Sequence, residues 1–270
     1  MRARFSRIEL VAALVVAAAA CGDGGDGGDG GPAAVDATTG GDAAAPPDGA
    51  DPRDGPVDGP PAPPLPGFGA ITGMCGVIGA AELDGSTPLW FQGELDFGTD
   101  RYDDPAERDR LTPGGREILI DGNAGGSSVY SELFAFEWLA RCEQAELIKT
   151  ENEIVYDVDG KKADLLVAIA GRKVGVSVTR AMTFPFGNPY TLAAATSLFE
   201  RKLDDIQLAT AQVSAGDRWS KQMLAVLAFD AQHAEVAMAA WNGLDAETRD
   251  HTLLVVAVTS GDDLFIYTDE

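Results

Sequence analysis

Residues 21–66 limit what this chain can fold into more than any other feature, because they offer almost nothing to a hydrophobic core. The segment CGDGGDGGDGGPAAVDATTGGDAAAPPDGADPRDGPVDGPPAPPLP contains no aromatic residue and few branched aliphatic ones. Such a composition cannot bury enough apolar surface to offset the conformational entropy lost on ordering. The sequence therefore predicts a disordered tether over 21–66 and a folded part that begins near Gly67.

The segment that precedes the tether has the layout of an export signal. Three arginines lie within the first seven residues, and residues 10–20 form an apolar core that is too short to span a bilayer as a helix. The small residues Ala18, Ala19 and Ala20 followed by Cys21 resemble a bacterial lipobox. This resemblance implies signal-peptide cleavage after residue 20, acylation of Cys21 (palmitate and related chains) and an exported lipoprotein on the outer membrane or the periplasmic face. Ordinary secretory cleavage near this point is the alternative.

The folded part is long enough for one sizeable core and is strongly acidic. Residues 67–270 carry 33 acidic and 16 basic residues, a net charge of −17. This charge disfavours long-range attraction to nucleic acid. Nine of the basic residues lie within 161–221, which leaves room for a local basic surface on an acidic domain.

The two cysteines of the folded part are Cys75 and Cys142. An exported domain meets an oxidising compartment, so a disulfide between them is expected on grounds of location. Both lie in apolar contexts, GMCGVIG and WLARCEQ, and buried free thiols are the alternative.

Hydrophobic periodicity divides the folded part into two regions. Residues 67–128 are predicted to be irregular and β-rich, and residues 129–270 are predicted to form an α/β domain. Helices are expected at 131–147, 193–213 and 230–244, and strands at 89–97, 116–121, 151–158, 162–170, 173–180, 221–229, 251–260 and 263–268.

A β-hairpin is predicted for KKADLLVAIAGRKVGVSVTR, residues 161–180. With Gly171 and Arg172 as the two turn residues, Asp164 would lie opposite Thr179. Because alternate residues share a face, Asp164, Ser177 and Thr179 are expected on one face of the hairpin. The branched residues of both strands would then form the opposite, core-facing surface.

From residue 130 the expected order of elements is αβββαβ, which resembles the core of the PD-(D/E)XK nuclease-like superfamily. The resemblance implies a Mg²⁺ site with Asp164 and a helical glutamate, Glu132 or Glu137, as ligands. Ser177 stands where the family has a second strand carboxylate, and Thr179 stands where it has a lysine. The motif is therefore incomplete in this chain.

Two basic residues are candidates to replace the missing lysine. Arg180 is adjacent to Thr179 but is expected on the other face of its strand. Lys202 lies at the edge of the apolar stripe of the 193–213 helix, and the resemblance implies that a lysine on this helix can take the role. A lysine that merely extends to solvent is the alternative for Lys202, and a structural ion pair is the alternative for Asp164.

Three functional hypotheses follow. The first is a lipid-anchored, nuclease-like domain that binds its ligand without cutting it. The second is a Mg²⁺-dependent nuclease or phosphodiesterase that uses Glu132, Asp164 and Lys202. The third is a structural or interaction lipoprotein of the cell envelope, attached to the membrane through its N-terminal lipid.

Overall fold

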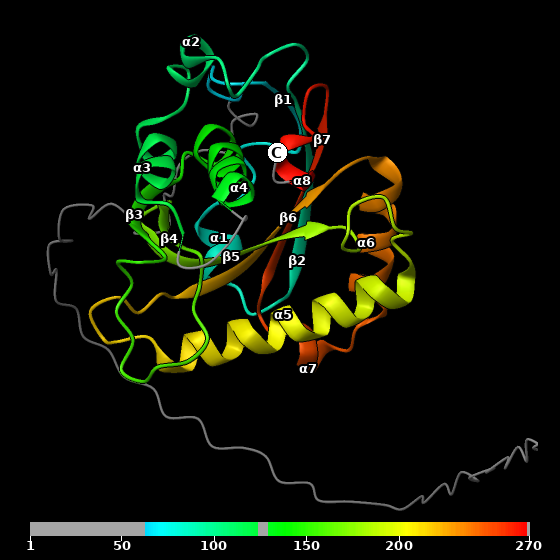
Figure 1. The fold of residues 1–270 in the computed structure, drawn as a ribbon. Helices are drawn as coiled ribbons and strands as arrows, with labels where there is room; N and C mark the ends of the chain where they lie inside the picture. Colours follow the sequence, from blue (N-terminus) through cyan, green and yellow to red (C-terminus); the bar gives the residue numbers. More distant parts are fainter. Residues whose placement is uncertain (1–62, 124–128, 269–270) are drawn as a thin grey trace, which may run out of the picture. The chain divides into compact units, whose positions relative to one another are not determined.

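A computed structural model describes residues 63–123 and 129–268, so the signal segment 1–20, Cys21 and nearly all of the 21–66 tether lie outside the described residues. The described residues form an α/β fold, as predicted, in which helices cover a seven-stranded mixed sheet (Figure 1). The elements are β1 (Ala70–Gly73), α1 (Ala80–Asp84), β2 (Leu89–Asp96), α2 (Pro105–Arg108), α3 (Pro113–Asp121), α4 (Val129–Cys142), β3 (Glu146–Thr150), β4 (Leu165–Ile169), β5 (Arg172–Ala181), α5 (Leu192–Gln212), β6 (Lys221–Ala228), α6 (Ala231–Gly243), α7 (Ala246–Arg249), β7 (Leu253–Ser260) and α8 (Phe265–Thr268).

The sheet has the strand order β1-β2-β7-β6-β5-β4-β3. Strands β2, β7, β6 and β5 are parallel neighbours, whereas β1, β4 and β3 pair antiparallel with their neighbours. Elements α4 to β6 follow the predicted order αβββαβ. Strands β1 and β2 extend the same sheet through the parallel pairing of β2 with β7, so residues 67–121 belong to the architecture of the whole domain.

Two apolar layers enclose the central strands. Every residue of β6 is buried, which explains why its sequence is an uninterrupted apolar run. Met223, Ala225 and Leu227 contribute to the layer formed with α4, and the residues between them contribute to the layer formed with α5 and α6. Helix α4 covers one face of the sheet and α5 covers the other. A polar side chain at the start of β4 therefore lies between two helices.

The prediction of a strand at 116–121 is wrong, because these residues belong to helix α3. Thr112 begins this helix as its N-cap, and its side chain accepts a hydrogen bond from the Gly115 amide at 3.1 Å. Pro113 occupies the first turn, where its missing N–H leaves no bond unmade. The capping signal therefore outweighs the alternating pattern of REILID.

Two further strand predictions are wrong for lack of a pairing partner. Strand β4 pairs with β3, with a bulge between Leu147 and Lys149, and residues 151–158 lie beyond the end of this pairing. The predicted helix 131–147 is also too long, since α4 ends at Cys142 and Gln144 adopts a left-handed φ of 54°. At the C-terminus, β7 already has β2 and β6 as neighbours, and residues 265–268 form helix α8 instead of a strand.

The C-terminal end of α4 binds the segment that enters the domain. Arg141 is buried and donates hydrogen bonds to the carbonyl oxygens of Leu65 (3.0 Å), Phe68 and Gly69 (2.8 Å). This guanidinium therefore fixes residues 65–69 against the helix before β1 begins.

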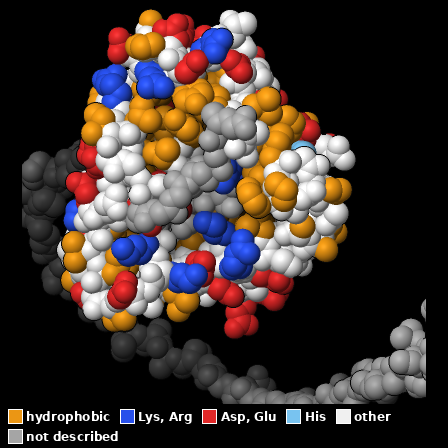
Figure 2. Space-filling view, in the orientation of Figure 1, with side chains coloured by type: hydrophobic (Ala, Val, Ile, Leu, Met, Phe, Trp, Pro, Cys, Tyr) orange, Lys and Arg blue, Asp and Glu red, His pale blue; other side chains and the backbone are white. Residues whose placement is uncertain are grey.

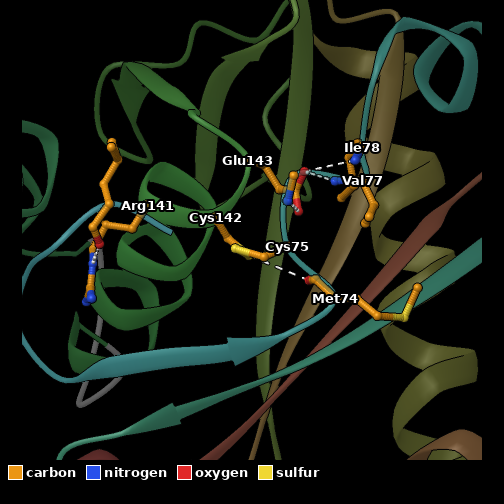
Figure 3. Close-up of a disulfide and its surroundings, with 9 residues drawn as sticks. Met74, Cys75, Val77, Ile78, Arg141, Cys142 and Glu143 are labelled. Carbon is orange, nitrogen blue, oxygen red and sulfur yellow. Dashed lines mark hydrogen bonds between the residues drawn. A yellow bond between two sulfur atoms is a disulfide. The ribbon is translucent and has the colours of Figure 1, made fainter. Parts of the chain in front are cut away.

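The next two residues of the helix end hold the segment that follows β1 (Figure 3). Cys142 forms a disulfide with Cys75, and Glu143 accepts hydrogen bonds from the backbone amides of Gly76, Val77 and Ile78 at 2.8–3.0 Å. We call Arg141, Cys142 and Glu143 the α4 clamp, because three consecutive residues hold both sides of β1.

No helix among residues 63–123 and 129–268 is long and apolar enough to cross a membrane.

Candidate metal site

Three carboxylates from different parts of the chain meet where α4 passes the end of β4. Glu132 lies in the first turn of α4, Glu151 follows β3 directly, and Asp164 precedes β4 directly. One oxygen atom of each carboxylate lies within 4.8 Å of the others. Glu132 is buried, and Glu151 and Asp164 are half-buried. The fold therefore gathers negative charge at a site that is only partly open to water.

The end of the β4–β5 ladder positions Asp164. Its amide donates to the Val176 carbonyl at 2.9 Å, and its Oδ2 accepts from the Val178 amide at 2.5 Å. Burial raises the pKa of the Asp164 carboxyl, and the neighbouring charge of Glu151 raises it further. The charge of Lys202 and the Val178 amide act in the opposite direction. The carboxylate is thus held rigidly in surroundings that disfavour its charge unless a cation is near.

The predicted hairpin is present, but its turn is one residue earlier than expected. Ala170 and Gly171 form the turn with φ values of 47° and 72°, as a type I′ turn requires. Arg172 is thereby released into β5, where it makes an ion pair with Asp84 at 2.7 Å. The pairing of Leu166 with Gly175 continues to place Asp164 level with Ser177, so the predicted pairing of Asp164 with Thr179 is wrong. The observed register differs from the expected one by two residues, so every side chain stays on the face predicted for it.

The structure separates the two helical glutamates that the sequence offered. Glu132 belongs to the carboxylate cluster and accepts a hydrogen bond from the Asn123 side chain at 3.1 Å. Glu137 is fully buried elsewhere, and its Oε1 accepts from both the amide and the hydroxyl of Thr112 at 2.7 Å. Burial raises the pKa of Glu137, although the hydrogen bonds from Thr112 act to lower it. Glu137 therefore anchors the start of α3, and Glu132 is the helical member of the site.

The two candidate cations lie in different surroundings. Lys202 extends from α5 and donates from Nζ to the Val178 carbonyl at 2.9 Å, so it contacts the residue whose amide binds Asp164. Arg180 donates to the carbonyl of Ile266 at 2.9 Å, on the side of the sheet where α8 packs. Lys202 is therefore the cation that the fold brings to the site.

The strand positions that carry charge in the nuclease-like pattern are neutral here. Ser177 is buried and Thr179 is half-buried. Glu151 supplies the further carboxylate instead, from the segment 151–158 that is predicted to be a strand. The sequence does contain a signal for Glu151. It is a glutamate directly after a short apolar run, and that run pairs with the strand that Asp164 precedes.

We expect the substitution Asp164→Asn to raise the melting temperature of the metal-free chain at pH 7 by a few degrees. An amide still accepts the Val178 hydrogen bond but carries no charge to bury. Each pKa unit of upward shift corresponds to about 1.4 kcal/mol, and about 1 kcal/mol moves the melting temperature of a domain of this size by about 2–4 °C. The pKa of Asp164 is raised in the folded state, so its charge does not lower the stability of the fold below the pKa of the unfolded state. The loss of stability develops as pH rises toward the folded pKa and is complete above it.

Thermal unfolding followed by circular dichroism between pH 3.5 and 7 would check this expectation. The gain should disappear at the acidic end of the range. Asp159→Asn is the matched control, because Asp159 is an exposed aspartate in the same loop. A variant less stable than the wild type at pH 7 would show that attraction to Lys202 outweighs burial.

Comparisons with known proteins assign no family to this chain. No family model matches it and no solved structure matches it. A curated relative, the AAC-rich mRNA clone AAC4 protein of Dictyostelium discoideum, is 37% identical over 152 residues, which cover 54% of this chain. The match spans 22% of the relative's own length.

Proposed function

We propose that Glu132, Glu151 and Asp164 bind a divalent cation, with Mg²⁺ as the first candidate. The observation that carries this proposal is the convergence of three carboxylate oxygens within 4.8 Å. Mg²⁺ binds oxygen ligands at about 2.1 Å, so two ligands on one ion lie roughly 3–4 Å apart. Small side-chain rotations are enough to bring the three groups to that separation.

The reaction that we infer for this site is hydrolysis of a phosphodiester. The element order αβββαβ and the placement of Glu132 and Asp164 support this inference through their resemblance to the PD-(D/E)XK nuclease-like core. A bound Mg²⁺ would supply Lewis-acid activation of the phosphate and a water of lowered pKa. The three carboxylates hold the cation, and the Asp164 position is fixed by the backbone of β5. Lys202 is placed to stabilise the negative charge that develops on the phosphate.

One observation favours a second candidate, in which the domain binds a phosphodiester without cleaving it. Ser177 and Thr179 are neutral, so the part of β5 beside Asp164 carries no charged side chain on that face. A neutral hydroxyl is a weak ligand for Mg²⁺. The contribution of Glu151 decides between the candidates, because it determines whether the cation is held by three carboxylates or two.

The surface near the site is less acidic than the domain as a whole. Figure 2 shows several Lys and Arg side chains, with Asp and Glu side chains among them, over the region of α5, the helix that carries Lys202. Lys161 and Arg201 are exposed in this region, and Lys161 pairs with Asp205 at 3.0 Å. This local charge supports an anionic substrate despite the net charge of −17 over residues 67–270.

We further propose that the domain is exported and held on a bacterial membrane by a lipid on Cys21. The basic, apolar and small-residue pattern of residues 1–21 supports this proposal. The Cys75–Cys142 disulfide fits an oxidising compartment. Two or three acyl chains are sufficient for stable anchoring, because each buried CH₂ contributes about 0.8 kcal/mol.

The proposed reaction is tested by incubating the full chain with single-stranded DNA, double-stranded DNA and RNA in the presence of Mg²⁺ or Mn²⁺. Cleavage should require the cation and should fall at least 100-fold in Asp164→Ala, because mutating even a residue that only supports a metal ligand typically costs about 10–100-fold and Asp164 is itself a proposed ligand. Lys202→Met should lower kcat, while cation binding that depends on Asp164 should persist.

The matched control is Asp159→Ala, an exposed aspartate outside the cluster, which should cleave as the wild type does. Cleavage that survives Asp164→Ala would overturn the assigned site. Cation binding that depends on Asp164, measured by calorimetry without any cleavage, would support the second candidate.

A further inference from the structure

A cavity with aromatic walls opens at the carboxyl ends of two adjacent parallel strands. Strands β5 and β6 end side by side, with Ala181 paired to Ala228. Met182 and Phe229 follow directly, and both line a cavity of about 430 Å³. The chain from Met182 to Tyr190 and the first turn of α6 complete it. Ligands of α/β folds commonly bind outside the carboxyl ends of parallel strands.

The walls of this cavity are flat rings. Phe186 and Phe229 pack edge to face with centroids 4.9 Å apart. Tyr190 and His233 lie nearly parallel, with an interplanar angle of 9° and centroids 5.6 Å apart. Ring faces and edges attract a further planar ring by stacking and by edge-to-face contact. The cavity therefore favours a flat ligand over a bulky saturated one.

His233 gives the cavity one oriented polar group. Its Nδ1 lies 2.6 Å from Oδ1 of Asp230, and the same oxygen caps α6 by accepting from the His233 amide at 2.8 Å. Burial opposes ionisation of Asp230, but the hydrogen bonds from His233 prevail and lower the pKa of this carboxyl. The Asp230 carboxylate can only accept, so in the imidazole form of His233 the proton is on Nδ1 and Nε2 is the acceptor. The opposite nitrogen, Nε2, is left as an acceptor on a side chain that is 21% exposed.

We propose that this cavity binds a small, uncharged planar ring that carries an N–H or O–H donor, with His233 Nε2 accepting the donor. A nucleobase and a phenol both have this chemistry. The binding site is formed by side chains other than those of the carboxylate cluster, and ligand binding here requires no divalent cation. Binding in this cavity is independent of hydrolysis at Asp164.

Calorimetric titration of the full chain in EDTA tests the proposal with four probes. Uridine and phenol present a donor on a flat ring, toluene is flat without a donor, and glucose has donors without a flat ring. We expect uridine, phenol or both to bind, with toluene weaker by about three- to tenfold because it lacks one hydrogen bond to a neutral acceptor. Preference between uridine and phenol identifies the source of the ring.

Three variants complete the test. His233→Phe keeps a flat ring but removes Nε2, so it should reduce the affinity for the donor-bearing probes to that for toluene. His251→Phe is the matched control, because His251 also pairs through Nδ1 with a neighbouring aspartate, Asp250, at 2.8 Å. Tyr190→Phe keeps the ring and removes the other buried polar atom of the walls, the Tyr190 hydroxyl, which has no hydrogen-bond partner among the described residues; a larger loss of affinity here than in His233→Phe would overturn the role of His233.

Failure of both uridine and phenol to show saturable binding would overturn the proposal. So would equal affinity of the wild type and His233→Phe for the bound probe, or a preference for glucose. The wild-type comparison of phenol with toluene needs no variant, so it decides the role of the donor even where a substituted chain folds poorly. Loss of cleavage at the carboxylate site would leave these results unchanged.

Discussion

Loss of the Cys75–Cys142 disulfide should lower the free energy of unfolding by about 4 kcal/mol. The two cysteines are 67 positions apart, so the bridge closes a long loop in the unfolded chain and removes much of its conformational freedom. Both residues are buried in the layer beside α4, so the reduced thiols can remain packed in the folded state. The expected effect is therefore mainly on the unfolded chain, and the fold itself should persist in mild denaturant.

Urea unfolding of the full chain with and without dithiothreitol measures this difference. In the double variant Cys75→Ala, Cys142→Ala, the reducing agent should have no effect, which separates this bridge from any chemistry at Cys21. A loss smaller than about 1 kcal/mol would contradict the expectation and would mean that the unfolded chain stays compact without the bridge.

The substitution Glu143→Ala should destabilise the domain by about 3–5 kcal/mol. Glu143 is 6% exposed, and its carboxylate accepts from the amides of Gly76, Val77 and Ile78. Truncation leaves three donors without their acceptor, and each buried unsatisfied donor costs about 1–3 kcal/mol. Partial hydration of the exposed edge of the segment keeps the total below the sum of three full penalties.

Equilibrium unfolding and hydrogen exchange of the three amides check this prediction together. Glu143→Gln keeps one acceptor oxygen and should lose roughly half as much stability, while Glu200→Ala on the exposed side of α5 should change stability by less than about 0.5 kcal/mol. Equal losses in the alanine and glutamine variants would show that the charge, and not the hydrogen bonds, holds the segment.

Long apolar patterns could be predicted from the sequence, because burial alone decides them. The apolar stripe of α5 and the continuous apolar run of β6 can each be buried in one favourable arrangement. Both elements lie where the sequence predicts them. Short segments are different, since their state depends on partners elsewhere in the chain. Residues 116–121 follow a helix cap, and residues 265–268 follow β7, which already pairs with β2 on one side and β6 on the other. Neither constraint is visible in the hydrophobic pattern of the segment itself.

The candidate site could be predicted in part for the same reason. Asp164 follows from the hairpin, and the choice between Glu132 and Glu137 needed the rotation of α4 about its axis, which the sequence leaves open. Glu151 was missed because the preceding strand was placed several residues too late. The turn was misplaced by one residue because Ala170 adopts a positive φ that glycine adopts more readily.

The α4 clamp also decides how the domain would respond to tension. Strand β1 has four residues at the edge of the sheet, and a short edge strand pulled from one end detaches one hydrogen bond at a time. Arg141 grips the chain before β1, at residues 65–69, so a pull from the N-terminal side loads these contacts first and in parallel. Beyond β1 the covalent bridge at Cys75 blocks further extension. In a domain pulled by its N-terminus, the hydrogen bonds of Arg141 would thus break first. The disulfide would then prevent further extension, and the force would not reach β2 and the rest of the sheet.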